Sequence, residues 1–271
     1  MLLTELEGFI EEDIGYNDVS CNIIPDCKVQ AEVVSNEDGI VSGLAEATQV
    51  FEYFEVFAPT DLTDGSAVKK NDIIFSLEGG ARSILKAERL ALNFLGRMSG
   101  ISSLTREYVD RANGVRIAGT RKTTPGFRKF EKKAVIAGGG DPHRFNLSDA
   151  ILIKDNHIAV TGLEKAVKSA KGMASFTQKI EVEVEDAGSA LQAAELGVDI
   201  IMFDNMGVDD IGKAIRSLAE KGLRDDVLLE ASGGITLQNI QDYAKTGVDV
   251  ISVGALTHSS SWLDISLKIK E

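Results

Sequence analysis

The chain has 271 residues, of which 44% are hydrophobic, and its 42 acidic and 29 basic side chains give a formal net charge of -13 at pH 7. It is long enough for one large α/β unit or two smaller domains, and its negative field disfavours a long polyanion such as a nucleic acid as partner. No run of about 18 uncharged apolar residues could span a bilayer, and the start, MLLTELEGFIEED, is acidic where a secretory signal would be basic, so we expect a cytoplasmic protein without a membrane partner.

The first part of the chain has the pattern of a small α+β domain. Apolar runs bounded by glycine or charge predict strands over 29–35, 39–43 and 72–79, with a helix over 45–54 between the second and third. A long helix is predicted from 82 to about 108, because Ile84, Ala91 and Leu95 recur at helical spacing. We expect this helix to break near Ser99 and Gly100. The N-terminal domain, with this connecting helix, would then cover residues 1–108.

After residue 108, short apolar strands alternate with helical segments. Six strands are predicted, over 115–120, 150–155, 179–184, 199–204, 227–232 and 250–255. Two strand junctions nearly repeat, LGVDIIMFDN at 196–205 and TGVDVISVGA at 246–255. Repeated βα units of this kind predict a parallel sheet that is closed or nearly closed into a barrel. Because six strands fall short of eight, we expect an incomplete barrel over 109–271, with a C-terminal helix that packs back on the N-terminal domain.

Positive charge is concentrated in one stretch, residues 120–157, which holds eight of the 29 Lys and Arg residues and two of the three histidines. In a βα barrel the loops at the carboxyl ends of the strands form the working face, and cations follow two of these ends. Arginine can bind a carboxylate through two hydrogen bonds at once. The predicted anion-binding residues are Arg121, Lys122, His143, Arg144 and Lys154. By contrast, Lys129, Lys132 and Lys133 are interpreted as ordinary helix surface.

Two acidic residues, Glu181 and Glu183, alternate with valines on a predicted barrel strand and therefore point to the same side. Such acids cost several kcal/mol inside a barrel unless they are paired or bind a metal. Glu183 and Asp204, which ends the next strand, offer hard oxygen ligands suited either to Mg²⁺ or to ribose hydroxyls. The ends of the last two strands are typical phosphate sites. They supply Ser232, Gly233, Gly234 and the loop from Gly254 to His258, so two anionic substrates are expected.

The order of these motifs resembles that of the quinolinate phosphoribosyltransferase family. The resemblance covers essentially the whole chain and is carried by EDIGYNDVS near the start, AERLALNFLGRMSGI from 87, GTRKTTPGFR from 119, EKKAVIAGGGDPHR from 131, LIKDNH from 152, IEVEVE from 180, FDNM from 203, EASGGI from 230 and GVDVISVGALTHS from 247. It implies a small N-terminal α/β domain followed by an open, about seven-stranded α/β barrel of the type II phosphoribosyltransferase kind. It also implies a homodimer or a higher homo-oligomer.

The resemblance further implies a pentosyltransferase reaction. The family joins quinolinate to the anomeric carbon of 5-phosphoribosyl 1-pyrophosphate with the help of Mg²⁺. The products are nicotinate mononucleotide, which feeds NAD biosynthesis, together with pyrophosphate and carbon dioxide.

The family's site residues map onto this chain motif by motif. Those that would surround the two quinolinate carboxylates are Arg121, Lys122, His143, Arg144 and Lys154, joined by Arg89 from the neighbouring subunit. Those that would hold phosphate are Ser232, Gly233, Gly234, Gly254 and His258. Glu183 and Asp204 would serve the ribose and the metal, and the catalytic set would be Lys122, Lys154, Glu183 and Asp204. The chain departs from the family pattern at Pro142, where many members carry asparagine before the His-Arg pair, and the fixed φ of proline changes the loop that aims His143.

Three alternatives remain open at this stage. A related ModD-like branch shares the fold and uses another acceptor, although the intact LIKDNH motif favours quinolinate. A nicotinate phosphoribosyltransferase would handle one carboxylate, whereas the many cations in 120–157 favour two. A non-catalytic sensor of a phosphate ligand could share the fold, and the intact Glu183 and Asp204 argue against it.

Overall fold

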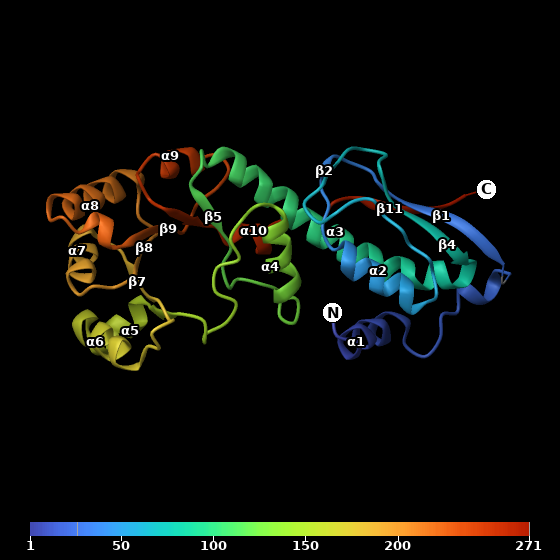
Figure 1. Cartoon of the computed structure of the whole chain (residues 1–271), viewed down its shortest axis with the longest axis horizontal. Coiled ribbons are helices and arrows are strands. Elements are labelled where there is room, and N and C mark those ends of the chain that lie inside the picture. Colours follow the sequence, from blue (N-terminus) through green and yellow to red (C-terminus); the bar gives the residue numbers. More distant parts are fainter. Residues whose placement is uncertain (26, 271) are drawn as a thin grey trace. The chain divides into compact units, whose positions relative to one another are not determined.

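The structure is a computed structural model that describes residues 1–25 and 27–270. The chain divides into two compact units (Figure 1). The first comprises Met1–Leu104, Ile136–Gly139 and Ser260–Glu271, and the second comprises Thr105–Val135 and Gly140–Ser259. Among the described residues, no helix is both long enough and apolar enough to cross a membrane.

The first unit is built on a three-stranded antiparallel sheet in the order β11-β1-β4. Its strands are β1 (Lys28–Ser35), β4 (Ile73–Gly80) and β11 (Ile265–Ile269). Phe75 of β4 packs edge-on against Phe51 of helix α2 (Leu44–Tyr53), with the ring centroids 5.8 Å apart. The other elements are α1 (Leu3–Ile14), a 3₁₀ helix (Cys21–Ile23) and the short antiparallel pair of β2 (Gly39–Ile40) and β3 (Ala67–Val68). The small α+β architecture predicted for this region is therefore present.

Helix α3 (Ala81–Arg111) is continuous, and the break predicted near Ser99 and Gly100 is absent from it. Gly100 serves a close approach of two backbones, because a Cβ atom there would lie 1.9 Å from the carbonyl oxygen of Ser261. Ser99 also has a packing role, since its Oγ accepts a hydrogen bond of 2.9 Å from the backbone N–H of Ser42. The pair that resembled a helix breaker is therefore explained by contacts with neighbouring segments.

The C-terminal segment forms strand β11, and the prediction of a helix there was wrong. Ile265, Leu267 and Ile269 alternate with polar residues, which is the period of a strand. Leu267 lies opposite Val33 in the antiparallel register with β1. The local pattern and the hydrogen-bond partners along the edge of β1 therefore both favour a strand here.

The second unit contains six parallel strands in the order β5-β10-β9-β8-β7-β6. All six predicted strands are present, within shorter bounds: β5 (Arg116–Ala118), β6 (Ile151–Ile153), β7 (Ile180–Val184), β8 (Ile200–Asp204), β9 (Leu228–Ser232) and β10 (Val250–Ser252). Over the described residues, no strand pairing joins the edges β5 and β6, so the barrel is open. An isolated parallel bridge between Ala118 and Asp141 extends the sheet beyond β5 in place of a seventh full strand.

Helices alternate with these strands along the chain. They are α4 (Arg128–Ala137), α5 (Asp155–Thr161), α6 (Leu163–Met173), α7 (Ala187–Glu195), α8 (Val208–Glu220), α9 (Ile240–Ala244), α10 (Ala255–His258) and a 3₁₀ helix (Arg224–Asp226). Figure 1 shows α7 and α8 beside β7 and β8. Val182 and Val184 of β7 are buried. The period of the strand then turns Glu181 and Glu183 to its opposite face.

Candidate active site

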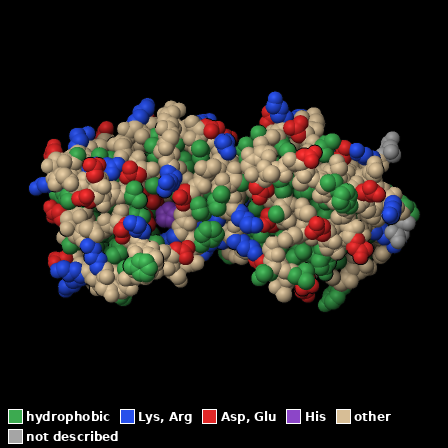
Figure 2. All heavy atoms as spheres, in the orientation of Figure 1, with side chains coloured by type: hydrophobic (Ala, Val, Ile, Leu, Met, Phe, Trp, Pro, Cys, Tyr) green, Lys and Arg blue, Asp and Glu red, His purple; other side chains and the backbone are tan. Residues whose placement is uncertain are grey.

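A cavity of about 510 Å³ lies at the carboxyl ends of the parallel strands of the second unit. Ten of the residues predicted from the sequence line it together: Arg121, Lys122, His143, Arg144, Lys154, Glu183, Asp204, Ser232, Gly233 and Gly234. In Figure 2, a histidine (purple) is visible beside Lys and Arg side chains (blue) on the face of this unit that is turned to the viewer. Ser252 at the end of β10 also lines the cavity, which therefore collects residues from the ends of all six parallel strands and from the loop before β6.

Two arginines give the cavity an excess of positive charge. Burial lowers the pKa of Arg144, and the nearby charge of Arg121 lowers it further. The Nε atom of Arg121 is buried and has no hydrogen-bond partner among the described residues. Two guanidinium groups that destabilise each other's charge, one of them with an unused donor, are the arrangement expected where an anion binds.

Two acidic residues that line the cavity, Glu183 and Asp204, offer carboxylate oxygens to a ligand. Glu183 has a side chain only 12% exposed, and its Oε1 accepts a hydrogen bond of 2.6 Å from Nζ of Lys154. Asp204, at the end of the adjacent strand β8, accepts a hydrogen bond of 3.0 Å from Nδ2 of Asn205. Two carboxylates on neighbouring strands are a donor set that fits Mg²⁺, which is usually held by one or two carboxylates together with substrate phosphates and water.

The turn after β9 brings the backbone close to the cavity. Gly233 and Gly234 have φ values of +89° and +62°, which favour glycine. A Cβ atom on Gly233 would lie 2.2 Å from Oδ1 of Asn205 and 2.8 Å from the backbone nitrogen of the same residue. No larger side chain fits there, so this turn can present backbone groups to an anion at short range.

Three predicted residues lie outside the set that lines the cavity. Gly254 and His258 are at the two ends of the α10 segment, and a Cβ atom on Gly254 would lie 3.1 Å from Cδ of Lys122. Thr257 of the same helix donates a hydrogen bond of 2.7 Å to the carbonyl oxygen of Lys122, so α10 borders the cavity. Arg89 belongs to the first unit, where it lines another hollow of about 540 Å³ with Asp18 and Lys86.

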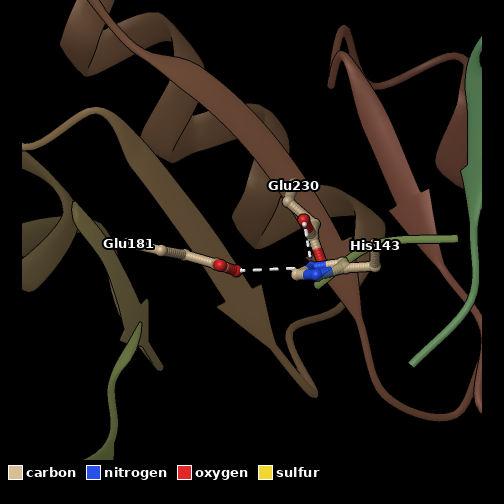
Figure 3. A group of neighbouring side chains, drawn as sticks. All are labelled: His143, Glu181 and Glu230. Carbon is tan, nitrogen blue, oxygen red and sulfur yellow. Dashed lines mark ion pairs between the residues drawn. The ribbon is translucent and has the colours of Figure 1, made fainter. Parts of the chain in front are cut away.

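His143, which lines the cavity, lies between two buried acids, Glu181 of β7 and Glu230 of β9 (Figure 3). Its Nε2 is 3.4 Å from Oε2 of Glu230 and 3.9 Å from Oε1 of Glu181. Its Nδ1 accepts a hydrogen bond of 2.7 Å from the backbone N–H of Arg144. The proton of the ring therefore lies on Nε2 and faces the acids. Both ring nitrogens are engaged within the protein, and the role of His143 as a carboxylate ligand stays a prediction.

The pKa values of this buried group follow from its packing. Burial raises the pKa of Glu181 to about 7, and the charge of Glu230 adds to the rise. Burial also opposes the charged form of His143, but the hydrogen bond and the charge of Glu230 outweigh it and raise the pKa of the ring. The ligand atoms of the three residues lie within 4.8 Å of one another, close enough to hold a metal ion. The proton on Nε2 accounts for the contact with Glu230 without one.

Two important residues were missed or misplaced by sequence reasoning. Glu230 was missed. It precedes Ser232 by two positions on β9, and because alternate residues of a strand share a face, this spacing could have predicted that Glu230 points into the barrel. Lys132 was interpreted as helix surface, and that was wrong, since it is 1% exposed. Its ammonium group donates a hydrogen bond to the carbonyl oxygen of Pro142 and lies 5.4 Å from the ring centroid of Phe145. These contacts join distant segments and leave no local signal.

Comparison with known proteins gives the same family over the whole chain. The models of the quinolinate phosphoribosyl transferase N-terminal and C-terminal domains match residues 16–99 and 101–268. The chain is 45% identical over 272 residues to the "Probable nicotinate-nucleotide pyrophosphorylase [carboxylating]" of Methanothermobacter thermautotrophicus, covering 98% of each chain. It is 38% identical to the human "Nicotinate-nucleotide pyrophosphorylase [carboxylating]", covering 89% of this chain and 82% of that one.

A solved structure agrees with these matches. The crystal structure of NadC from Streptococcus pyogenes superimposes with a TM-score of 0.92 at 40% identity, covering 99% of this chain and 96% of that one. Both family models, the relatives and this structure span the two units. The chain therefore belongs to the quinolinate phosphoribosyl transferase family.

Proposed function

We propose that this chain transfers the 5-phosphoribosyl group of 5-phosphoribosyl 1-pyrophosphate to quinolinate with decarboxylation, giving nicotinate mononucleotide, pyrophosphate and carbon dioxide. Family membership and the names of the full-length relatives support this reaction. The observation that carries it is the cavity itself, which is lined both by the cations Arg121 and Arg144 and by the acids Glu183 and Asp204. That arrangement suits a dianionic acceptor and a sugar that becomes positively charged as it reacts.

The cationic side of the cavity would bind the acceptor. A pyridine dicarboxylate brings two negative charges, which the guanidinium groups of Arg121 and Arg144 can each meet with paired hydrogen bonds. Lys122 and Lys154 line the same cavity and can contribute further point charges. Binding the dianion would also relieve the repulsion between the arginines, so the free site is prepared for its ligand.

The acidic side would serve the ribosyl donor. Loss of pyrophosphate leaves positive character on the ribose, and carboxylates fixed nearby stabilise it without reorganising. Glu183 is held for this role by its hydrogen bond from Lys154. We propose that Glu183 and Asp204 also hold Mg²⁺, which when bound would balance the charge of the leaving pyrophosphate. The Ser232-Gly233-Gly234 turn, with Gly254 and His258 at the border, would hold phosphate.

Positioning supplies much of the rate. Holding the ring nitrogen of the acceptor in line with the anomeric carbon makes a bimolecular step effectively unimolecular, worth up to about 7–11 kcal/mol in favourable cases. After the new bond forms, the positive charge on the quaternary ring nitrogen stabilises the electron pair that departing carbon dioxide leaves on the adjacent ring carbon, and this carbon then takes up a proton. No side chain need form a covalent bond to substrate.

We further propose a cytoplasmic homodimer or higher homo-oligomer in which Arg89 enters the neighbouring subunit's cavity. This proposal rests on the family resemblance, and Arg89 is suited to it because it is a cation on a helix at the border of a separate hollow. Light scattering coupled to size exclusion would give the mass of the assembly, and a monomer at assay concentration would contradict the proposal.

The reaction is tested by incubating the protein with quinolinate, 5-phosphoribosyl 1-pyrophosphate and Mg²⁺. We expect nicotinate mononucleotide and carbon dioxide in equal amounts, and no turnover when the metal is chelated. Nicotinate in place of quinolinate is the matched control. Turnover of nicotinate alone would contradict the proposed acceptor, and uptake of ligand without release of pyrophosphate would identify a sensor.

A further inference from the structure

Helix α4 buries two adjacent charged residues, although neither lines the cavity. Glu131 is 0% exposed and Lys132 is 1% exposed. Burying a charge is costly unless hydrogen bonds replace its water. The partners of these residues, and of Arg128 one turn before, therefore indicate what the helix does.

One set of partners belongs to the first cationic loop. Glu131 accepts hydrogen bonds from the backbone N–H and from Oγ1 of Thr124, at 3.0 and 2.9 Å. Nε of Arg128 donates a hydrogen bond of 2.9 Å to Oγ1 of Thr123. These threonines directly follow Arg121 and Lys122, so α4 anchors the loop that carries half of the cationic wall.

The other set belongs to the second cationic loop. Lys132 donates to the carbonyl oxygen of Pro142, and Nη1 of Arg128 donates a hydrogen bond of 3.1 Å to the carbonyl oxygen of Phe145. Only His143 and Arg144 lie between these two anchored carbonyl groups. The segment is thus fastened at both ends by the same helix.

The backbone of this segment needs such fastening. His143 has φ +54°, a left-handed conformation that is costly for a residue with a side chain and persists only when the surroundings hold it. Pro142 has no N–H to donate, so its carbonyl group is its only backbone hydrogen-bonding group. Burial lowers the pKa of Lys132 to about 8, so the ammonium is largely charged at neutral pH and makes a charge-assisted hydrogen bond.

We propose that Lys132 is a positioning residue for acceptor binding, which fixes the carbonyl group of Pro142 and thereby aims Arg144 into the cavity. The proposal rests on the function proposed above. It assigns a role in acceptor specificity to a side chain that does not touch the substrate. The ribosyl side of the cavity, formed by β7, β8 and the turn after β9, is not anchored by these contacts and should be unaffected.

The test replaces Lys132 with methionine, which keeps the length and the apolar stem but cannot donate a hydrogen bond. We expect the KM for quinolinate to rise about 10- to 100-fold, as for loss of one charge-assisted hydrogen bond, with the KM for 5-phosphoribosyl 1-pyrophosphate unchanged within about twofold. Lys133→Met is the matched control, because Lys133 is the next residue of the same helix and is exposed. It should leave both constants unchanged.

If Lys132 only stabilised the fold, the variants would behave differently from the expectation above. If Lys132→Met lowers only the melting temperature, or raises both KM values equally, the positioning role is wrong. Lys132→Gln is a milder variant that keeps a shorter, uncharged donor, and we expect an intermediate KM for quinolinate. Should the methionine variant fail to fold, an unchanged quinolinate KM in Lys132→Gln would overturn the proposal. Wild-type protein without quinolinate turnover would instead overturn the proposed function.

Discussion

The amino and carboxyl ends of the barrel strands both carry charged side chains, but the carboxyl ends include a buried arginine nitrogen, Nε of Arg121, that has no hydrogen-bond partner among the described residues. At the amino ends, Asp199 accepts hydrogen bonds of 2.8 Å from Nζ of Lys179 and from the backbone N–H of Ile180. Asp249 accepts 2.9 and 2.8 Å hydrogen bonds from Arg224 and from the backbone N–H of Leu229. At the carboxyl ends, Arg121 and Arg144 instead raise each other's electrostatic energy.

Cavity size does not separate the two ends. The hollow at the amino ends has about 630 Å³ and the one at the carboxyl ends about 510 Å³. The larger hollow is lined by Asp199 and Asp249, whose hydrogen-bond partners are supplied by the protein. The smaller one is lined by Arg144 and by Arg121, whose Nε has no hydrogen-bond partner among the described residues. Charges that are satisfied internally stabilise the barrel, whereas charges left in mutual repulsion store the energy that a ligand releases.

The largest effect is expected when one arginine is removed at each end of the strands, which tests whether the carboxyl ends serve activity and the amino ends serve stability. Arg121→Ala should lower kcat/KM for quinolinate by at least about 100-fold, since it removes charge-assisted hydrogen bonds to a buried carboxylate. Arg224→Ala, the matched change at the amino ends, should leave kcat/KM unchanged and lower the melting temperature. Steady-state kinetics and thermal melts of both variants check this. Equal losses of activity would show that the two ends do not divide function and stability.

The sequence was sufficient to predict all six parallel strands, although with longer bounds than the structure has, and it was least informative about contacts between distant segments. The repeat of Gly-Val-Asp before two strands is local and marks the end of a helix and the start of a strand together. The buried Lys132 contacts Pro142 and Phe145, which follow it by 10 and 13 residues in the chain. Nothing in the adjacent sequence distinguishes Lys132 from Lys133. Likewise, the glycine at position 100 suggested a break in the helix, whereas the structure shows that a side chain there would collide with the backbone at Ser261.

In the candidate site, too, the sequence predicted where the side chains of β7 lie but did not predict the tertiary contacts that set their protonation. Alternation predicted that Glu181 and Glu183 share a face, which agrees with their places in the structure. Their chemistry differs because of tertiary surroundings. Glu183 pairs with Lys154 at the cavity, while Glu181 is closed over by His143 from a distant loop. Burial by another segment is a property that no pattern within β7 contains.

The buried Glu181 of β7 makes the stability of the protein depend on pH, and this dependence can be measured. The folded pKa of Glu181 is about 7, above the ordinary 4.5, so between these values the folded state binds more protons than the unfolded state and stability falls as pH rises. Glu181→Gln removes this contribution. From pH 5 to 8 it should therefore lose less stability than the wild type, by on the order of 3 kcal/mol. Urea unfolding across this range measures the difference, with the exposed Glu185→Gln as control. Parallel pH profiles of the wild type and Glu181→Gln would contradict the assignment.

The smallest expected effect is on stability, and it tests whether the ion pair of Asp249 at the amino ends of the strands contributes to folding. Asp249→Asn keeps one oxygen for the backbone N–H of Leu229 but loses the ion pair with Arg224, whose side chain is 23% exposed. Such a hydrogen-bonded, half-buried pair should contribute about 1 kcal/mol. Asp242→Asn is the control, because its ion pair with Lys245 spans 3.7 Å between side chains that are 64% and 69% exposed, and exposed pairs contribute close to nothing. Urea midpoints should separate the two variants while quinolinate kinetics stay those of the wild type. A loss of kcat/KM in Asp249→Asn would mean that the amino ends also reach the chemistry, and the division between the two ends would have to be abandoned.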